Sequence, residues 1–117
     1  MSNKEGIVHG SGAVIAGVWA TVEQRKQTMP EKSYVATLLR KGTDSICCKL
    51  AEECGESIKA AREQGAGAVT NELCDLLFHM MVLMADRNIS LKDLESEFAK
   101  RHGISGLDEK AARKKNG

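Results

Sequence analysis

Hydrophobic residues recur every three or four positions along most of the chain, the spacing that places them on one face of a helix. Between residues 13 and 27 the apolar positions include Trp19, which is predicted to pack inside the protein rather than stack on a base. Met29-Pro30 ends this first helix, because the residue before a proline disfavours the α region. The same spacing predicts four further helices, over residues 33–40, about 44–64, about 68–87 and 91–102.

Residues typical of helix ends stand at the expected boundaries. Ser33 can cap the second helix and Gly42 can end it. Ser90 and Asp93 have the spacing of a capping box at the start of the last helix. These signals support the same division of the chain into helices.

The predicted fold class is all-α. No stretch alternates apolar and polar residues as a half-buried strand does, and aromatic residues make up only 3% of the chain, too few for a sheet. We expect a bundle of four to five helices around an antiparallel central pair, which turns at Gly65-Ala66-Gly67.

Length and charge narrow the function classes. A chain of 117 residues suggests one domain, and a net charge of +1 gives little attraction to nucleic acid or membranes. We see neither an apolar run of membrane-spanning length nor a signal-peptide pattern, and therefore expect a cytoplasmic protein. The predicted boundaries are a disordered segment over 1–12, a helical domain over 13–105 and a basic C-terminal tail over 106–117.

The four cysteines do not have the spacing of a zinc site. They are Cys47, Cys48, Cys54 and Cys74, with no C-x-x-C pair among them. We predict small buried side chains with free thiols, which fits a reducing cytoplasm.

The second helix of the central pair is apolar on almost every side. Nearly every residue from 73 to 85 is hydrophobic, as in a helix that is buried all round. A domain this small cannot cover all of these side chains by itself. We therefore predict a homodimer or a higher homo-oligomer, with both central helices in the interface.

Acidic residues stand in two pairs of helical spacing on the central helices. Residues three apart share a helix face, so antiparallel pairing can bring the two pairs together. Carboxylates beside an apolar run are costly unless they are protonated, paired or bound to a metal. Two interpretations stay open: salt bridges with nearby bases, or a site for a hard divalent cation such as Mg²⁺. The acids are Glu53, Glu56, Glu72 and Asp75, and the candidate bases are Lys49, Lys59 and Arg62.

These acids carry a resemblance to a known superfamily. Glu-Glu-x-x-Glu at 52–56 followed by Glu-x-x-Asp at 72–75 resembles the signature of the all-α nucleoside triphosphate pyrophosphohydrolases, which include MazG-like proteins and dimeric dUTPases. Within this superfamily the chain is most similar to the phosphoribosyl-ATP pyrophosphohydrolase family, through the motifs at 33–42, 75–79 and 101–113. The sequence departs from the family pattern at Gly55 and at Phe78, where the family often has tyrosine. Neither change removes a carboxylate.

The resemblance implies a MazG-like bundle completed by dimerisation and a Mg²⁺-dependent activity. The reaction would convert phosphoribosyl-ATP and water to phosphoribosyl-AMP and pyrophosphate, the second step of histidine biosynthesis. Glu52 and Glu53 would serve catalysis, with Glu52 orienting or deprotonating the attacking water. The metal ligands would be Glu53, Glu56, Glu72 and Asp75.

Several other side chains are candidates for holding the substrate. For each basic one, an ordinary solvated charge is the alternative. His79 has two interpretations as well, a core histidine bonded to a backbone group or carboxylate, or an outer partner of Asp75. The substrate-binding candidates are Ser33, Tyr34, Arg40, Lys41, Lys49, Lys110 and Arg113.

Three rival functions remain from the sequence. A house-cleaning pyrophosphohydrolase acting on other nucleotides would have the same acids without requiring the outer motifs. A non-catalytic helical dimerisation module would use the acids in salt bridges alone. A nucleic-acid-binding protein could use the basic tail, but the near-neutral charge and acidic centre argue against it.

Overall fold

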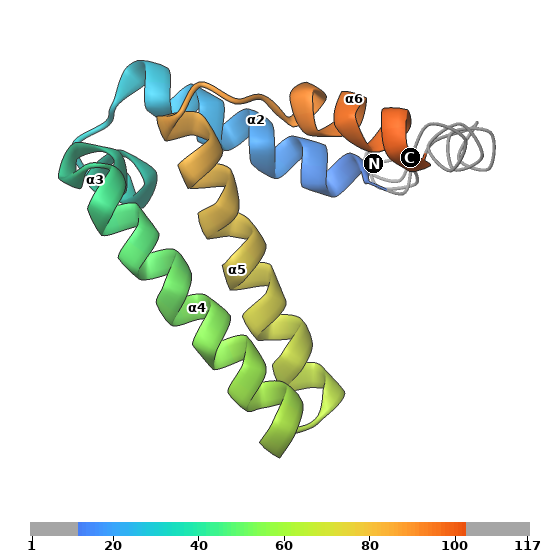
Figure 1. Ribbon diagram of the computed structural model, residues 1–117. Helices are drawn as coiled ribbons and strands as arrows, with labels where there is room; N and C mark the ends of the chain where they lie inside the picture. Colours follow the sequence, from blue (N-terminus) through green and yellow to red (C-terminus); the bar gives the residue numbers. More distant parts are fainter. Residues whose placement is uncertain (1–11, 103–117) are drawn as a thin grey trace, which may run out of the picture.

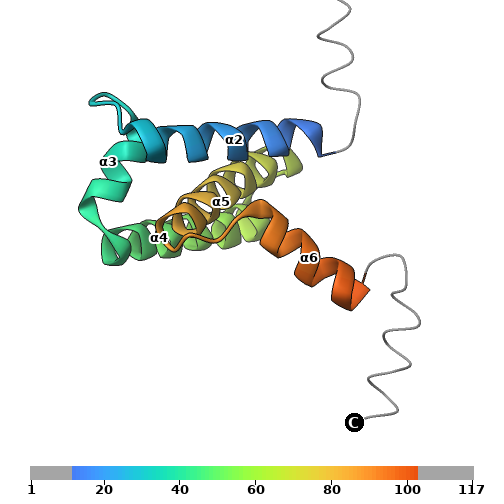
Figure 2. The same cartoon turned by 90° about the horizontal axis from the view of Figure 1, so that it is seen from above.

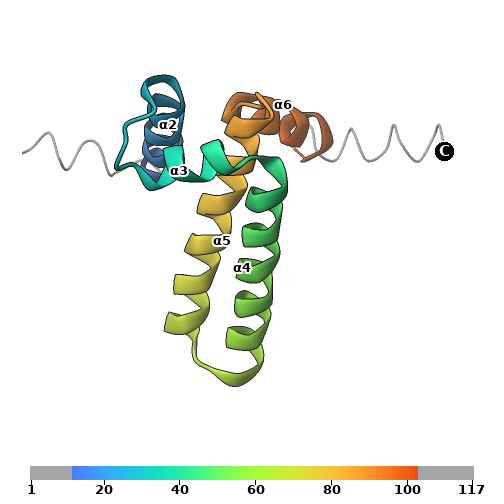
Figure 3. The same ribbon diagram turned by 90° about the vertical axis from the view of Figure 1, so that its left-hand side faces the viewer.

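The computed structural model describes residues 12–102, which form five α-helices and no strand. The long helices α4 and α5 run side by side in opposite directions and form a hairpin, which projects away from the other helices (Figures 1 and 3). The predicted all-α class and the antiparallel central pair are therefore confirmed. The helices are α2 (Ala13–Thr28), α3 (Tyr34–Lys41), α4 (Thr43–Glu63), α5 (Ala66–Asp86) and α6 (Leu91–His102).

The helix ends follow the capping signals of the sequence. The Ser33 hydroxyl accepts a hydrogen bond from the Ala36 amide at 3.1 Å and begins α3. Gly42 separates α3 from α4 with a φ of +97°, a conformation that side chains with a Cβ rarely adopt. Ser90 and Asp93 cap each other at the start of α6, with distances of 2.8 and 3.0 Å.

The core lies where α2 and α3 pack against the start of α4 and the end of α5, far from the α4–α5 turn (Figures 1 and 2). Trp19 is buried there, as predicted, and Val22, Ile46 and Val82 are fully enclosed. Burying such side chains contributes about 1.5–3 kcal/mol each, so this cluster anchors both central helices. Its members are Trp19, Val22, Val35, Leu38, Ile46, Met81, Val82, Met84 and Ala85.

The far half of the hairpin is a pair of helices with an open outer surface. Ser57 and Ala60 are the buried residues of α4 in this half, and their small side chains allow close contact with α5. In contrast, Ile58 and Leu73 are about half exposed, at 54% and 50%, and Leu77 is 36% exposed. Large apolar side chains thus remain uncovered on α4 and α5.

One expectation about α5 needs correction. Among the described helices, α5 is the one that could cross a membrane by length and composition alone. The prediction that no apolar run reaches that length is therefore wrong on this criterion. The small residues at the start of α5, from Ala66 to Thr70, extend the apolar run toward the turn.

The prediction of buried cysteines is also wrong. Cys47, Cys48, Cys54 and Cys74 are all free, as expected, but all four are exposed. They lie on surfaces of α4 and α5 that no other helix of residues 12–102 covers. The helical period placed Cys47 and Cys54 on one side of α4, but it could not show which neighbour would pack against that side.

Candidate metal centre

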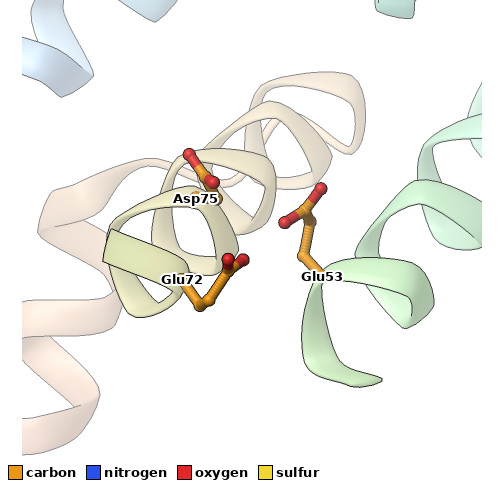
Figure 4. A group of neighbouring side chains, drawn as sticks. All are labelled: Glu53, Glu72 and Asp75. Carbon is orange, nitrogen blue, oxygen red and sulfur yellow. The ribbon is translucent and has the colours of Figure 1, made fainter. Parts of the chain in front are cut away.

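Three carboxylates from the two central helices converge between them. Glu53 comes from α4, and Glu72 and Asp75 come from α5, one helical turn apart (Figure 4). One oxygen of each lies within 4.8 Å of an oxygen of the others. Glu53 and Glu72 are half-buried and Asp75 is exposed, so the cluster opens to solvent on one side.

The position of Glu53 follows from the face that α4 turns toward α5. Glu53, Ser57 and Ala60 are four and then three positions apart, so they lie along one side of the helix. Ser57 and Ala60 are buried against α5, and the Ser57 hydroxyl donates to the Glu53 carbonyl at 2.9 Å. The same face therefore directs the Glu53 carboxylate toward α5 rather than into bulk water.

Little positive charge lies beside this cluster. Lys49 Nζ is 3.6 Å from Glu53 Oε2 and also 3.6 Å from Glu52 Oε1. The proximity of Tyr34, followed by that of Glu52 and Glu53, raises the pKa of Lys49 above its ordinary value. Glu72 and Asp75 have no ion pair within residues 12–102. The salt-bridge interpretation thus accounts for one of the three carboxylates.

The donor set fits a hard divalent cation. Carboxylate oxygens are the ligands that Mg²⁺ prefers, and it commonly keeps several waters beside one or two carboxylates. Twice the Mg–O distance of about 2.1 Å is roughly 4.2 Å, so small side-chain rotations allow one ion to bridge oxygens 4.8 Å apart. Three protein ligands would leave positions for water or phosphate oxygens.

Two of the predicted acids lie outside this cluster. Glu56 is exposed and is not among the converging carboxylates. It follows Glu53 by three residues, which places it about 60° around the helix from the face that contacts α5. Glu52 is adjacent to the cluster in sequence, but its side chain is 66% exposed and paired with Lys49.

A buried histidine links the cluster to α3. His79 Nδ1 is 2.7 Å from the Asp75 carbonyl oxygen, and its Nε2 is 3.0 Å from the Tyr34 hydroxyl. The core interpretation with a backbone partner therefore describes His79, which touches the main chain of Asp75 rather than its carboxylate. The i, i+4 spacing of Asp75 and His79 was a sequence signal for the first contact. No local signal indicated the second, which joins residues 45 positions apart.

Comparison with known proteins shows a match over most of the chain. The family described as phosphoribosyl-ATP pyrophosphohydrolase matches residues 17–102. This chain belongs to that family.

Curated relatives of the family are named phosphoribosyl-ATP pyrophosphatase. The protein of Azoarcus sp. (strain BH72) is 46% identical over 101 residues, which cover 86% of this chain and 94% of the relative. The Aromatoleum aromaticum protein is 45% identical over 86% of this chain and 93% of its own. The Nitrosospira multiformis protein is 48% identical over 80% of this chain and 78% of its own.

The motif over 33–42, which includes all of α3 and is one of those by which the sequence resembles this family, serves structural contacts in part. Arg40 Nη2 donates to the Met29 and Pro30 carbonyls at 2.9 and 3.3 Å, so this nitrogen holds the loop after α2. Lys41 is exposed and belongs to none of the ion pairs formed within residues 12–102. Arg40 thus makes a structural contact, whereas Lys41 stays a candidate for binding phosphate.

The other substrate-binding candidates also include both residues with structural contacts and residues that stay candidates. The Ser33 hydroxyl is occupied as the cap of α3. Lys49 is paired with Glu53 at the edge of the carboxylate cluster and stays a candidate for binding phosphate. Lys110 and Arg113 fall outside the described residues, as do the proposed basic tail and most of the segment over 1–12.

Proposed function

We propose that this chain hydrolyses phosphoribosyl-ATP to phosphoribosyl-AMP and pyrophosphate in histidine biosynthesis, with Mg²⁺ held by Glu53, Glu72 and Asp75. The observation that carries the proposal is the convergence of these three carboxylates within 4.8 Å in a member of this family. The names of its relatives support the substrate.

The charge of the substrate explains the need for a metal. A triphosphate carries about four negative charges near neutral pH, and three bare carboxylates that lie this close together would repel it. Bound Mg²⁺ would neutralise phosphate oxygens and lower the pKa of a coordinated water, which makes attack on the anhydride easier.

Two residues beside the cluster take roles in the reaction. Glu52 is exposed next to Glu53, where its carboxylate can orient the attacking water or accept its proton. Lys49 stays positively charged and lies against both acids, so it can hold a phosphate oxygen at the edge of the cluster. The water oxygen would form a bond to the α-phosphorus as its proton passes to Glu52, the bond from that phosphorus to the oxygen that bridges to the β-phosphorus would break, and pyrophosphate would leave.

The proposal includes a cytoplasmic homodimer or larger homo-oligomer. The α4–α5 hairpin carries the exposed side chains of Ile58, Leu73 and Leu77, and a second protein surface packed on them would remove this apolar area from water. A second hairpin packed on the first would build a four-helix arrangement and bury these side chains. The three carboxylates face between α4 and α5 and would stay at the edge of that interface.

Substrate profiling tests this function. We expect release of pyrophosphate from phosphoribosyl-ATP at rates far above those for ATP, dUTP and other nucleoside triphosphates. Preference for another triphosphate would indicate a house-cleaning pyrophosphohydrolase that uses the same carboxylate site. Absence of release from every triphosphate, from a folded protein, would favour the helical dimerisation module.

A further inference from the structure

His79 has both ring nitrogens occupied in the interior. A carbonyl oxygen can only accept, so Nδ1 carries the proton and donates it to the Asp75 carbonyl. Nε2 then accepts the Tyr34 O–H at 3.0 Å. The residue is only 5% exposed, and neither ring nitrogen bonds to a carboxylate within the described chain.

The ring of Tyr34 is held by α5 on two sides. It lies nearly parallel to the Phe78 ring, at an interplanar angle of 15° with centroids 6.1 Å apart. It meets His79 edge-on, with centroids 5.8 Å apart. Tyr34 is still 49% exposed, so its hydroxyl is anchored while much of the side chain faces solvent.

These contacts connect a candidate metal ligand on α5 with the first residue of α3. The connection begins at the Asp75 carbonyl, passes through His79 and ends at the Tyr34 hydroxyl. His79 therefore joins the backbone beside the carboxylate cluster to the half-exposed Tyr34 ring.

We propose that His79 is a positioning residue, which fixes the half-exposed Tyr34 ring as one wall of the substrate site. This inference rests on the proposed function. It assigns Tyr34 to the site through its ring, because its hydroxyl proton is committed to His79. His79 sets the position of the Tyr34 ring and does not itself contact the substrate.

A double-mutant cycle with Tyr34→Phe and His79→Gln tests the proposal. Each single change should raise KM for phosphoribosyl-ATP by about 5- to 10-fold, the cost of one buried hydrogen bond to an outer partner, and leave kcat within about twofold. The double variant should be no worse than either single one, because both changes break the same contact. Multiplying effects, or an unchanged KM in either single variant, would overturn the proposal.

Thr43→Val is the matched control for lost stability. It removes a hydroxyl that donates to Asp86 at 2.6 Å, a side-chain contact between α4 and α5 away from Tyr34. We expect a lower Tm and an unchanged KM. A KM increase as large as that of Tyr34→Phe would show that general destabilisation explains the effect, and would overturn the proposal.

Nitrogen NMR of the histidine ring gives a readout separate from activity. We expect the His79 spectrum of the whole protein to show a protonated Nδ1 and a bare Nε2, with the Nε2 shift moving in Tyr34→Phe. A protonated Nε2 in the wild type would overturn the proposal. A wild type with the expected spectrum that leaves phosphoribosyl-ATP intact would instead contradict the proposed function.

Discussion

Lys49 Nζ lies 3.6 Å from Glu53 Oε2, and this is the one ion pair that the carboxylate cluster makes within the described residues. Three carboxylates and one ammonium leave two negative charges, which one divalent cation would neutralise. Lys49 is also shared with Glu52, so its charge is not fully available to the cluster. The charges therefore favour a bound cation over a closed set of salt bridges.

Glu53→Gln should weaken Mg²⁺ binding more than any change outside the cluster. Mutating an outer partner of a metal ligand lowers metal affinity by about 10- to 100-fold, so removing a charged ligand should lower it at least as much. Calorimetric titration with Mg²⁺ measures the effect. Glu63→Gln, at the end of the same helix, is the control and should bind Mg²⁺ like the wild type.

Glu56→Gln distinguishes the two possible sets of ligands. The sequence pattern makes Glu56 a fourth ligand, and on that basis the variant should fold but lose metal-dependent hydrolysis. The structure places Glu56 in solvent outside the cluster, so we expect a smaller loss of Mg²⁺ affinity than in Glu53→Gln. Equal losses in the two variants would restore the four-ligand set.

Thr43→Val should lower the free energy of unfolding by about 1–2 kcal/mol, because it leaves the half-buried Asp86 carboxylate without its donor. Asp86 ends α5, where a negative charge already opposes the helix dipole. Urea unfolding measures the change. Thr70→Val, which removes an exposed bond within α5, should change stability by less than about 0.5 kcal/mol.

Ile58→Glu should shift the protein toward the monomer. Ile58 is 54% exposed on the hairpin, so the isolated chain tolerates the charge while an interface there would not. Sedimentation velocity reports the mass. Val14→Glu, at a similarly exposed site on α2, should leave the assembly intact, and dissociation by that control alone would place the interface elsewhere.

Local sequence patterns were sufficient to predict the helices and the three carboxylates that converge. The period of the apolar residues gave each helix to within a few positions, and the Ser90–Asp93 spacing gave a capping box. Glu72 and Asp75 share a face because they are three apart on one helix, and Glu53 lies opposite because the hairpin is antiparallel.

Features that depend on which surfaces meet could not be predicted in this way. Cys47 and Cys54 share a face with apolar residues of α4, but the described chain provides no helix to cover them. Glu56 has the same spacing from Glu53 that Asp75 has from Glu72, yet rotation about α4 turns it away from α5. The bond from Tyr34 to His79 joins distant parts of the sequence and follows from tertiary packing alone.

The most direct test of the metal centre is pyrophosphate release from phosphoribosyl-ATP as Mg²⁺ is titrated into metal-free protein. We predict no release without Mg²⁺, saturable release with it, and a shift to much higher Mg²⁺ concentrations in Glu53→Gln but not in Glu63→Gln. Release from metal-free protein kept in chelator that equals the release with added Mg²⁺ would contradict a metal centre built on these carboxylates. Identical Mg²⁺ dependence in the two variants would contradict it as well.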